Sequence, residues 1–391
     1  MPKANVISTT MEGQLTQAAT TPEDELQSLE RGAKEFNFIE FWNLGEVEPI
    51  EPPKTAVPFV WHWKDIEPRL MAAASLKDLD NTDRRALLLS NPGFPGKPYA
   101  TDTLLAAYSL YNSGEEAAVH RHTPSASRFV LSGEGGFTTI EGEKCEMKRG
   151  DLIITPAGTW HDHGNEGKDP IIWVDILNYP LVSNLNALTF EFDYTESKDG
   201  SNTGGPIPQK IQTIREPANH SQNMYGTGGI APLFTSHTRG PTEHSPMFVY
   251  RWENTNEALQ KMRDYEGSLY DGIIVEYTNP ATGGPVMPTM SFRSQLLRPS
   301  EHTQSHRHIS SSIYCVLKGN GYSIVDGEKF EWSENDVFAI PGWKWHEHVN
   351  PSKDSDVVLY SVTDEPVFRK LGLFREDRKT ASGSVESFTY Q

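Results

Sequence analysis

The 391-residue sequence contains an internal duplication, and this repeat restricts the possible folds more than any other feature. Phe59-Val-Trp-His-Trp63 recurs as Phe248-Val-Tyr-Arg-Trp252, and His120-Arg-His122 recurs as His306-Arg-His308, at an offset of about 186 residues. An Asn-Pro pair, a Gly-Glu-Lys turn and a Pro…Trp-His-x-His segment recur in the same order. Five landmarks at a nearly constant spacing predict that the chain is two copies of one domain.

Each copy is predicted to consist of short strands joined by tight turns. In the first copy, Gly-Glu-Gly, Glu-Gly-Glu and Arg-Gly-Asp turns separate the predicted strands 128–131, 136–140, 152–155 and 171–176. Many short strands with glycine-rich turns are typical of a sandwich or a closed barrel. We therefore predict an all-β jelly roll for each copy.

A helix is predicted near the N-terminus, over residues 22–36. Thr21 can cap this helix, Pro22 suits its first turn, and acidic residues crowd its N-terminal end. The expected order along the chain is an N-terminal arm with a helix (1–57), a first barrel domain (58–182), a connecting segment (183–245), a second barrel domain (246–370) and a tail (371–391).

Three histidines of the first copy form the pattern of a metal site. His120 and His122 are two positions apart on a predicted strand, so their side chains point to one face. His161 follows 39 residues after His122, on a separate strand. A lone histidine is usually a surface or core residue, but this set occurs twice at corresponding places. Three neutral imidazoles leave open coordination positions, and we interpret the set as a mononuclear Fe(II) site.

Two further histidine features accompany this set. His163 lies two residues after His161 on the same strand face, where it can act as an acid or base beside the metal. The second copy keeps the ligand pattern in His306, His308 and His346. Whether that copy also binds a metal stays open at this point.

Composition narrows the possible partners and location. A formal net charge of −18 argues against binding to nucleic acid or to an anionic membrane surface. Cys145 and Cys315 are the only cysteines, too few for a disulfide framework. No apolar run approaches the ~18 residues of a membrane span, and the N-terminus lacks the pattern of a signal peptide. We expect a cytoplasmic protein.

The cupin pattern is His-x-His, then a proline-containing segment, then a third histidine. It matches His120-Arg-His-Thr-Pro-Ser-Ala-Ser-Arg128, Gly150-Asp-Leu-Ile-Ile-Thr-Pro156 and Thr159-Trp-His-Asp-His-Gly-Asn-Glu166. With Asp83-Arg-Arg…Asn91-Pro-Gly93, these stretches resemble the bicupin ring-cleaving dioxygenases that act on gentisate, salicylate or 1-hydroxy-2-naphthoate. The similarity covers about residues 58–370. It implies two tandem cupin barrels, Fe(II), an aromatic hydroxy acid and O₂ as substrates, and a homotetramer.

Many cupins carry a glutamate four or five positions after the second histidine. Ala126 and Ser127 stand there in the first copy, and Ser312 and Ile313 in the second. This difference counts against a bicupin of the manganese oxalate-decarboxylase type. An all-histidine site leaves Fe(II) with its full charge, which an anionic substrate that chelates through two oxygens would neutralise.

Several polar residues of the first copy have expected roles beside the metal. The guanidinium fork of Arg128 can hold a carboxylate or a ring hydroxyl. The resemblance implies that Arg84 is a second anion anchor and that Asp175 supports the His163 region, although either residue could be purely structural. The second copy has Tyr314 at the place of Arg128 and Ser361 at that of Asp175. We therefore expect catalysis in the first copy.

The residues before the His-x-His strand bear on the substrate. Single-ring relatives often carry Thr-Leu-Trp-Ala-Gly-Leu-Gln, whereas this chain has Thr103-Leu-Leu105-Ala-Ala107-Tyr-Ser109. Leu105 and Ser109 are smaller than Trp and Gln, so a pocket that they line would admit a fused second ring. Ala107, where some salicylate enzymes have Gly, disfavours plain salicylate. The preferred substrate is thus 1-hydroxy-2-naphthoate, with gentisate or a substituted salicylate such as nitrosalicylate as alternatives.

A different class of function stays open from sequence alone. Some bicupins are isomerases or non-catalytic binding proteins that hold Zn or Mn, although storage relatives typically lack the histidines. Iron near one per chain together with O₂ uptake would support the dioxygenase. Zinc without O₂ uptake would favour the alternative.

Overall fold

The computed structural model describes residues 21–44, 49–76, 85–195, 207–208, 212–230, 232 and 243–389. The chain divides into two compact units, 1–53 and 54–391. In the first unit, α1 (Pro22–Phe36) confirms the predicted helix, and η1 (Phe41–Asn43) follows it. Thr21 Oγ1 accepts the Asp24 N–H at 3.2 Å, and the Asp24 carboxylate accepts the Thr21 N–H at 3.0 Å. This reciprocal capping box begins the helix at a defined residue.

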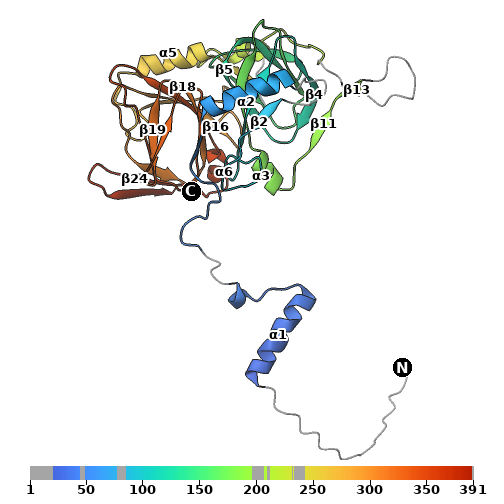
Figure 1. The fold of residues 1–391 in the computed structure, drawn as a ribbon, viewed down its shortest axis with the longest axis vertical. Helices are drawn as coiled ribbons and strands as arrows, with labels where there is room; N and C mark the ends of the chain where they lie inside the picture. Colours follow the sequence, from blue (N-terminus) through green and yellow to red (C-terminus); the bar gives the residue numbers. More distant parts are fainter. Residues whose placement is uncertain are drawn as a thin grey trace, which may run out of the picture. The chain divides into compact units, whose positions relative to one another are not determined.

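The second unit contains two β-barrels, which confirms the predicted all-β bicupin fold (Figure 1). Each barrel has an inner sheet that packs against the other barrel and an outer sheet. The inner sheet of the first barrel has the order β14-β8-β5-β10-β3-β2, with the ranges Val249–Tyr250, Leu152–Thr155, Ala126–Ser132, Ile171–Leu177, Leu105–Tyr111 and Ala86–Leu88. Its outer sheet has the order β11-β4-β9-β6-β7, with the ranges Phe190–Phe192, Glu116–His122, His161–Asn165, Glu134–Ile140 and Glu143–Lys148.

The second barrel repeats this arrangement. Its inner sheet has the order β1-β21-β18-β23-β16-β15, with the ranges Phe59–Trp61, Val337–Ile340, Ser312–Lys318, Val357–Thr363, Ser291–Leu297 and Ile273–Glu276. Its outer sheet has the order β20-β19-β22-β17-β24-β25, with the ranges Glu328–Trp332, Gly321–Val325, His346–Val349, His306–His308, Arg375–Lys379 and Val385–Thr389. Short elements complete the described chain, namely α3 (Tyr179–Asn184), β12 (Tyr194–Thr195), β13 (Ile207–Pro208), α4 (His220–Tyr225) and α6 (Glu365–Lys370).

The two copies exchange their first strands. β1 pairs with β21 of the second barrel, and β14 pairs with β8 of the first. Each exchanged strand leads into a helix, α2 (Trp63–Leu76) or α5 (Trp252–Met262). The domain limits near residues 58 and 246 stay predictions, because each barrel takes an edge strand from the other copy.

A buried aspartate of the opposite copy receives the first N–H of each of these helices. Asp336 Oδ1 accepts the Trp63 N–H at 2.6 Å, and Asp151 Oδ1 accepts the Trp252 N–H at 2.9 Å. The residue before each tryptophan contacts the second oxygen of the same carboxylate, at 2.9 and 2.6 Å. A carboxylate at a helix N-terminus satisfies a backbone donor and interacts favourably with the helix dipole. Two reciprocal carboxylate caps thus stabilise the exchange of strands between the two copies.

The main hydrophobic core lies between the two inner sheets. Successive strand residues point to opposite faces, so Phe129 of β5 and Val174 of β10 face this core while their neighbours face the barrel interior. At its centre the rings of Phe129 and Tyr360 stack at 3.9 Å between centroids. The first barrel's interior face carries polar residues such as Arg128 and Asp175 beside a second apolar cluster that includes Val130 and Trp173.

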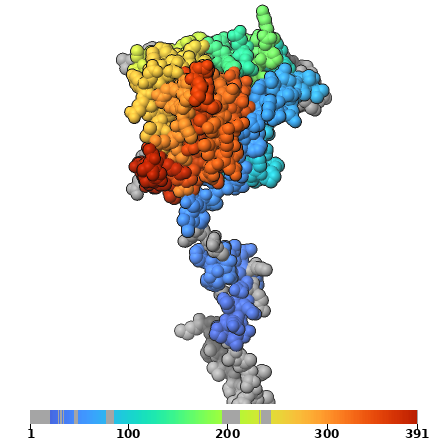
Figure 2. Space-filling view, turned by 60° about the vertical axis from the view of Figure 1, so that its left-hand side comes forward, coloured from blue at the N-terminus to red at the C-terminus, as the bar shows by residue number. Residues whose placement is uncertain are grey.

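The C-terminal segment adds two strands to the second barrel. β24 pairs with β17, the strand that carries His306, and β25 pairs with β24. Figure 2 shows this segment in dark red at the surface of the second barrel. The region expected as a tail (371–391) therefore contains ordered structure up to residue 389.

Candidate active site

The first barrel contains a cavity of about 340 Å³ on the interior face of its inner sheet. Alternate residues of three neighbouring strands form its wall. β3 supplies Leu105, Ala107 and Ser109, β5 supplies Arg128, and β10 supplies Asp175. His122 and His163 also line the cavity. The three positions predicted from sequence to face a pocket thus lie in this wall.

Four histidine rings gather beside the cavity. The ring centroids of His120 and His161 are 4.2 Å apart, those of His122 and His161 are 4.8 Å apart, and those of His120 and His122 are 5.8 Å apart. His163 lies 5.3 Å from His161 and 5.5 Å from His120. The structure therefore brings together the four histidines that were singled out from sequence, from β4 and β9.

Backbone hydrogen bonds fix the orientation of three of these rings. The Nδ1 atoms of His120, His122 and His161 donate to the carbonyl oxygens of Ala118, Pro124 and Thr159 at 2.7, 2.7 and 2.8 Å. Each bond fixes the tautomer in which Nε2 carries the lone pair that binds a metal.

The donor set fits a metal ion. Among the described residues, the buried Nε2 of His161 has no hydrogen-bond partner. Burial, followed by the neighbouring imidazoles, holds the pKa of His161 well below its ordinary value, so the ring is neutral near pH 7. A buried polar atom without a partner is costly, and a bound cation would satisfy it.

Distance alone selects a different trio from these four histidines. Ligand nitrogens of His120, His161 and His163 lie within 4.8 Å of one another, whereas His122 falls outside this described set. Both nitrogens of His163 already have protein partners: Arg128 Nη2 donates to Nε2 at 3.0 Å, and Nδ1 lies 3.1 Å from Thr138 Oγ1. His163 is therefore less suited to a metal than His122, whose Nε2 points away from its backbone bond.

Arg128 lies in the cavity wall and has several polar side-chain partners. Its Nη1 donates to Thr155 Oγ1 at 2.5 Å, and its Nε lies 3.3 Å from Asp175 Oδ1. Ser109 Oγ donates to the other oxygen of Asp175 at 2.6 Å. A network therefore runs from Ser109 through Asp175 and Arg128 to His163. Asp175 was expected to support the His163 region, and in the structure it is connected to His163 through Arg128.

Arg84, the second predicted anion anchor, lies outside the described residues. Its neighbour Arg85 is buried and bonds Glu115 and the carbonyl oxygen of Leu110, while Ala86 lines the cavity.

Several residues that contact the site were not singled out by sequence. Thr138 and Thr155 hold His163 and Arg128, and the stacked rings of Tyr111 and Trp173, 4.7 Å apart, close one side of the cavity. Thr155 lies inside the Gly150…Pro156 motif, which was a usable signal. The places of Thr138, Tyr111 and Trp173 beside the cavity follow only from strand register.

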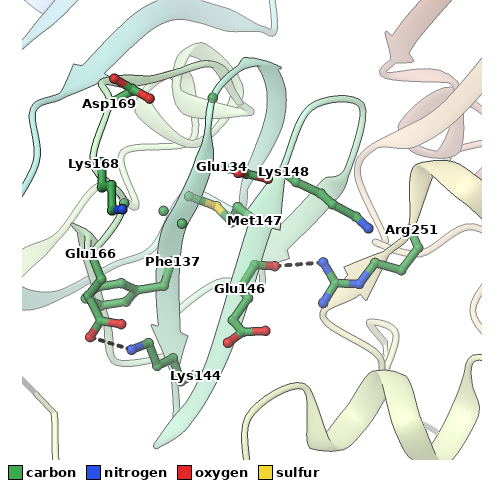
Figure 3. Close-up of a pocket in the computed structure, with 14 residues that line it drawn as sticks. Glu134, Phe137, Lys144, Glu146, Met147, Lys148, Glu166, Lys168, Asp169 and Arg251 are labelled. Carbon is green, nitrogen blue, oxygen red and sulfur yellow. Dashed lines mark hydrogen bonds and ion pairs between the residues drawn. The ribbon is translucent and has the colours of Figure 1, made fainter.

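A larger hollow of about 830 Å³ lies on the outer sheet of the first barrel (Figure 3). Lys144 and Glu166 form an ion pair there at 2.6 Å, and Arg251 donates to the carbonyl oxygen of Glu146 at 2.9 Å. None of its described lining residues is a histidine. The smaller cavity beside the histidines is therefore the candidate active site.

Comparison with known proteins agrees with this geometry. A family model described as a cupin domain matches residues 107–177 and 294–363. A 5-aminosalicylate 1,2-dioxygenase from Comamonas sp. is 36% identical over 371 residues, which is 93% of each chain. A 1-hydroxy-2-naphthoate 1,2-dioxygenase from Nocardioides sp. (strain KP7) is 33% identical and covers 92% of this chain and 88% of its own. The chain belongs to this family of ring-cleaving 1,2-dioxygenases.

A solved structure supports the dioxygenase fold over most of the chain. The salicylate 1,2-dioxygenase from Pseudoaminobacter salicylatoxidans in adducts with gentisate aligns with a TM-score of 0.80 and 29% identity, over 94% of this chain and 97% of that one. In the described part of the dioxygenase, no helix is both long and apolar enough to span a membrane.

Proposed function

We propose that this dioxygenase holds Fe(II) on His120, His122 and His161 and opens an aromatic hydroxy acid between its carboxyl- and hydroxyl-bearing carbons. The observation that carries the proposal is a cavity lined by His122, Arg128 and apolar side chains. The rings of His120 and His161 lie beside that of His122. When bound, the iron would supply open coordination positions and the redox chemistry that O₂ requires.

Arg128 is proposed to bind the substrate carboxylate. The guanidinium has five N–H donors, and Thr155 and Asp175 fix its plane from one side. A held guanidinium loses little conformational entropy when a carboxylate binds, and the charge-assisted bond is strong in a buried wall. The site therefore selects an acid by a positioned cation, although the whole chain is acidic.

His163 is proposed to handle a proton beside the reacting ring. Because Arg128 can only donate, the His163 Nε2 accepts, and the single proton of the neutral ring then lies on Nδ1 toward Thr138. Nε2 becomes available as a base only when the bond to Arg128 opens. Engagement of Arg128 by the substrate carboxylate would open it, which would couple proton uptake to binding.

The preferred substrate is proposed to be 1-hydroxy-2-naphthoate. Leu105, Ala107 and Ser109 form one row of the wall, and Leu105 and Ser109 are smaller than the Trp and Gln of single-ring relatives. Leu88, Ala126 and Leu177 add apolar surface. An apolar pocket with few polar anchors suits a bicyclic acid. An amino-substituted salicylate is a second candidate, because Asp175 and Ser109 offer acceptors for an amino group and the 5-aminosalicylate enzyme is similar over most of the chain.

The decisive experiment is an anaerobic titration of the Fe(II)-loaded enzyme with 1-hydroxy-2-naphthoate, gentisate, salicylate, 5-aminosalicylate and 5-nitrosalicylate, followed by O₂. We expect an absorbance change on binding, one O₂ consumed per substrate and the largest kcat/KM for the naphthoate. Faster turnover of gentisate would overturn the substrate assignment. A lack of O₂ uptake with every acid, or full activity with zinc, would overturn the reaction itself.

The assembly and compartment are also proposed from the family resemblance. We expect a homotetramer, and light scattering of the purified protein would test this expectation. Cys145 and Cys315 are both buried free thiols, as suits a reducing cytoplasm.

A further inference from the structure

The second barrel reproduces the geometry of the first histidine set. The ring centroids of His306 and His346 are 4.3 Å apart, those of His308 and His346 are 5.0 Å apart, and those of His306 and His308 are 5.5 Å apart. Each spacing agrees with its counterpart in the first barrel within 0.3 Å. Ligand nitrogens of these three histidines lie within 4.8 Å of one another.

Backbone hydrogen bonds also fix the orientation of two rings of this second set. His308 Nδ1 donates to the carbonyl oxygen of Ser310 at 2.8 Å, and His346 Nδ1 donates to that of Lys344 at 2.9 Å. Nε2 of His346 is buried and, among the described residues, has no hydrogen-bond partner. These bonds repeat the tautomers of His122 and His161 and leave an inward lone pair that a cation would satisfy.

His306 differs from its counterpart in the partner of Nδ1. Where His120 uses a backbone carbonyl, His306 Nδ1 lies 3.5 Å from Glu376 Oε1 on strand β24. Arg378 holds the same carboxylate at 2.8 and 3.0 Å. A carboxylate on the far nitrogen of a ligating histidine fixes the ring and raises its basicity.

The surroundings of the second set do not suit an aromatic acid. Tyr314 pairs with Ser361 at the register where Arg128 pairs with Asp175, so the anion-binding guanidinium is replaced by a phenol ring. That ring stacks on Phe338 at 4.7 Å. This barrel can therefore hold a metal, but it lacks the arginine that would bind a substrate carboxylate at this position.

A second arginine stands where the first barrel is open. Arg293 pairs with Ser361 as Ala107 pairs with Asp175, and it donates to Glu365 at 2.6 Å. Its long side chain lies where Ala107 has only a methyl group, and the Glu365 carboxylate balances its charge. The space that Ala107 leaves for substrate is thus filled.

We propose that the second barrel is a separate divalent transition-metal site formed by His306, His308 and His346, closed to aromatic acids and coupled to the C-terminal hairpin through Glu376. The metal orients His306, His306 engages Glu376, and β24 is thereby held against β17. The site stabilises the second barrel and takes no part in ring cleavage. It is independent of the substrate proposed for the first barrel.

The test counts metal in matched variants of the full-length enzyme. Apo-protein prepared with a chelator is reloaded with Co(II) and analysed by mass spectrometry of the metal. The wild type should bind two ions per chain. His346→Ala should bind one ion and keep ring-cleaving activity after iron loading, whereas His161→Ala should bind one ion and lose that activity. One ion in the wild type, unchanged by His346→Ala, would overturn the proposal.

Glu376→Gln keeps all three histidine ligands, so it tests the second metal site even if His346→Ala fails to fold. It should weaken binding of the second Co(II) by about 10- to 100-fold while the first remains tight. Chelation should also lower the Tm of His161→Ala, because its one remaining ion is proposed to lie in the second barrel. Unchanged affinity in Glu376→Gln would refute the coupling to the hairpin. Failure of every aromatic acid as a substrate would leave these metal counts unaffected.

Discussion

Arg128 donates a hydrogen bond from Nη2 to Nε2 of His163 at 3.0 Å. The bond joins the proposed carboxylate anchor to the proposed proton acceptor, on β5 and β9. Arg128 is also held by Thr155 and Asp175, so the cation faces the cavity in one orientation. In the proposed function, binding of an acid to Arg128 would release the lone pair of His163 in the same event.

Replacement of Arg128 by lysine should remove this coupling. Lysine keeps the charge but has no planar fork, so it cannot hold Thr155, Asp175 and a carboxylate together. We expect kcat/KM to fall about 100-fold with iron content unchanged. Steady-state O₂ uptake and metal analysis measure both. Arg149→Lys, on the half-exposed Arg149–Glu334 pair, is the control and should stay within about twofold of wild type.

Enlarging Leu105 should change substrate choice. Leu105→Trp places an indole in the wall where the second ring of a naphthoate is proposed to lie. We expect kcat/KM for 1-hydroxy-2-naphthoate to fall at least about 10-fold more than that for gentisate. Leu104→Met on the opposite strand face, in the core between the sheets, is the control. Equal losses for both substrates would contradict the assignment of this wall.

Asp364 should make stability depend on pH. Burial raises the pKa of its carboxyl from 3.8 to about 6, although hydrogen bonds from Thr103 and Ser311 lower this pKa. A raised folded-state pKa means that the folded chain holds the proton more tightly than the unfolded chain. This stabilisation is complete below about pH 4 and is lost as the pH rises through about 6. The loss amounts to roughly 3 kcal/mol.

The first barrel contains the matched neutral group for this test. Asn178 accepts the Ser125 N–H at 2.8 Å and donates to Thr289 at 2.9 Å, as an asparagine at 364 would toward Ser311 and Thr103. Asp364→Asn should therefore gain stability over wild type as the pH rises, and Asn178→Asp should lose it. Urea unfolding at about pH 4 and about pH 8 measures both. A pH-independent difference would contradict the burial argument.

The reciprocal helix caps should stabilise the strand exchange. Asp151→Ala removes the acceptor of the Trp252 N–H and leaves Arg251 without its buried partner oxygen. We expect the free energy of unfolding to fall by about 2 kcal/mol or more. Asp336→Ala, which uncaps Trp63, should cost a similar amount, whereas Asp354→Ala at an exposed turn should cost little. Chemical denaturation compares the three variants.

Local signals in the sequence determined several parts of this protein. The duplication predicted two barrels, and Thr21 and Pro22 predicted where α1 begins. The comparison of residues 103–109 with the family's motif pointed to side chains that line the cavity. The alignment of Tyr314 with Arg128 also agrees with strand register. Such features depend on residues a few positions apart, or on the comparison of one copy with the other.

The tertiary structure alone decided which distant groups meet. Nothing near residue 60 in the sequence indicates that β1 completes the second barrel, and nothing near Asp151 indicates that it caps α5. The bond from Arg128 to His163 and the approach of Glu376 to His306 likewise join strands far apart in the chain. Hydrogen-bond partners of this kind depend on how whole sheets pack, and sheet packing minimises the free energy of the entire core rather than of any local segment.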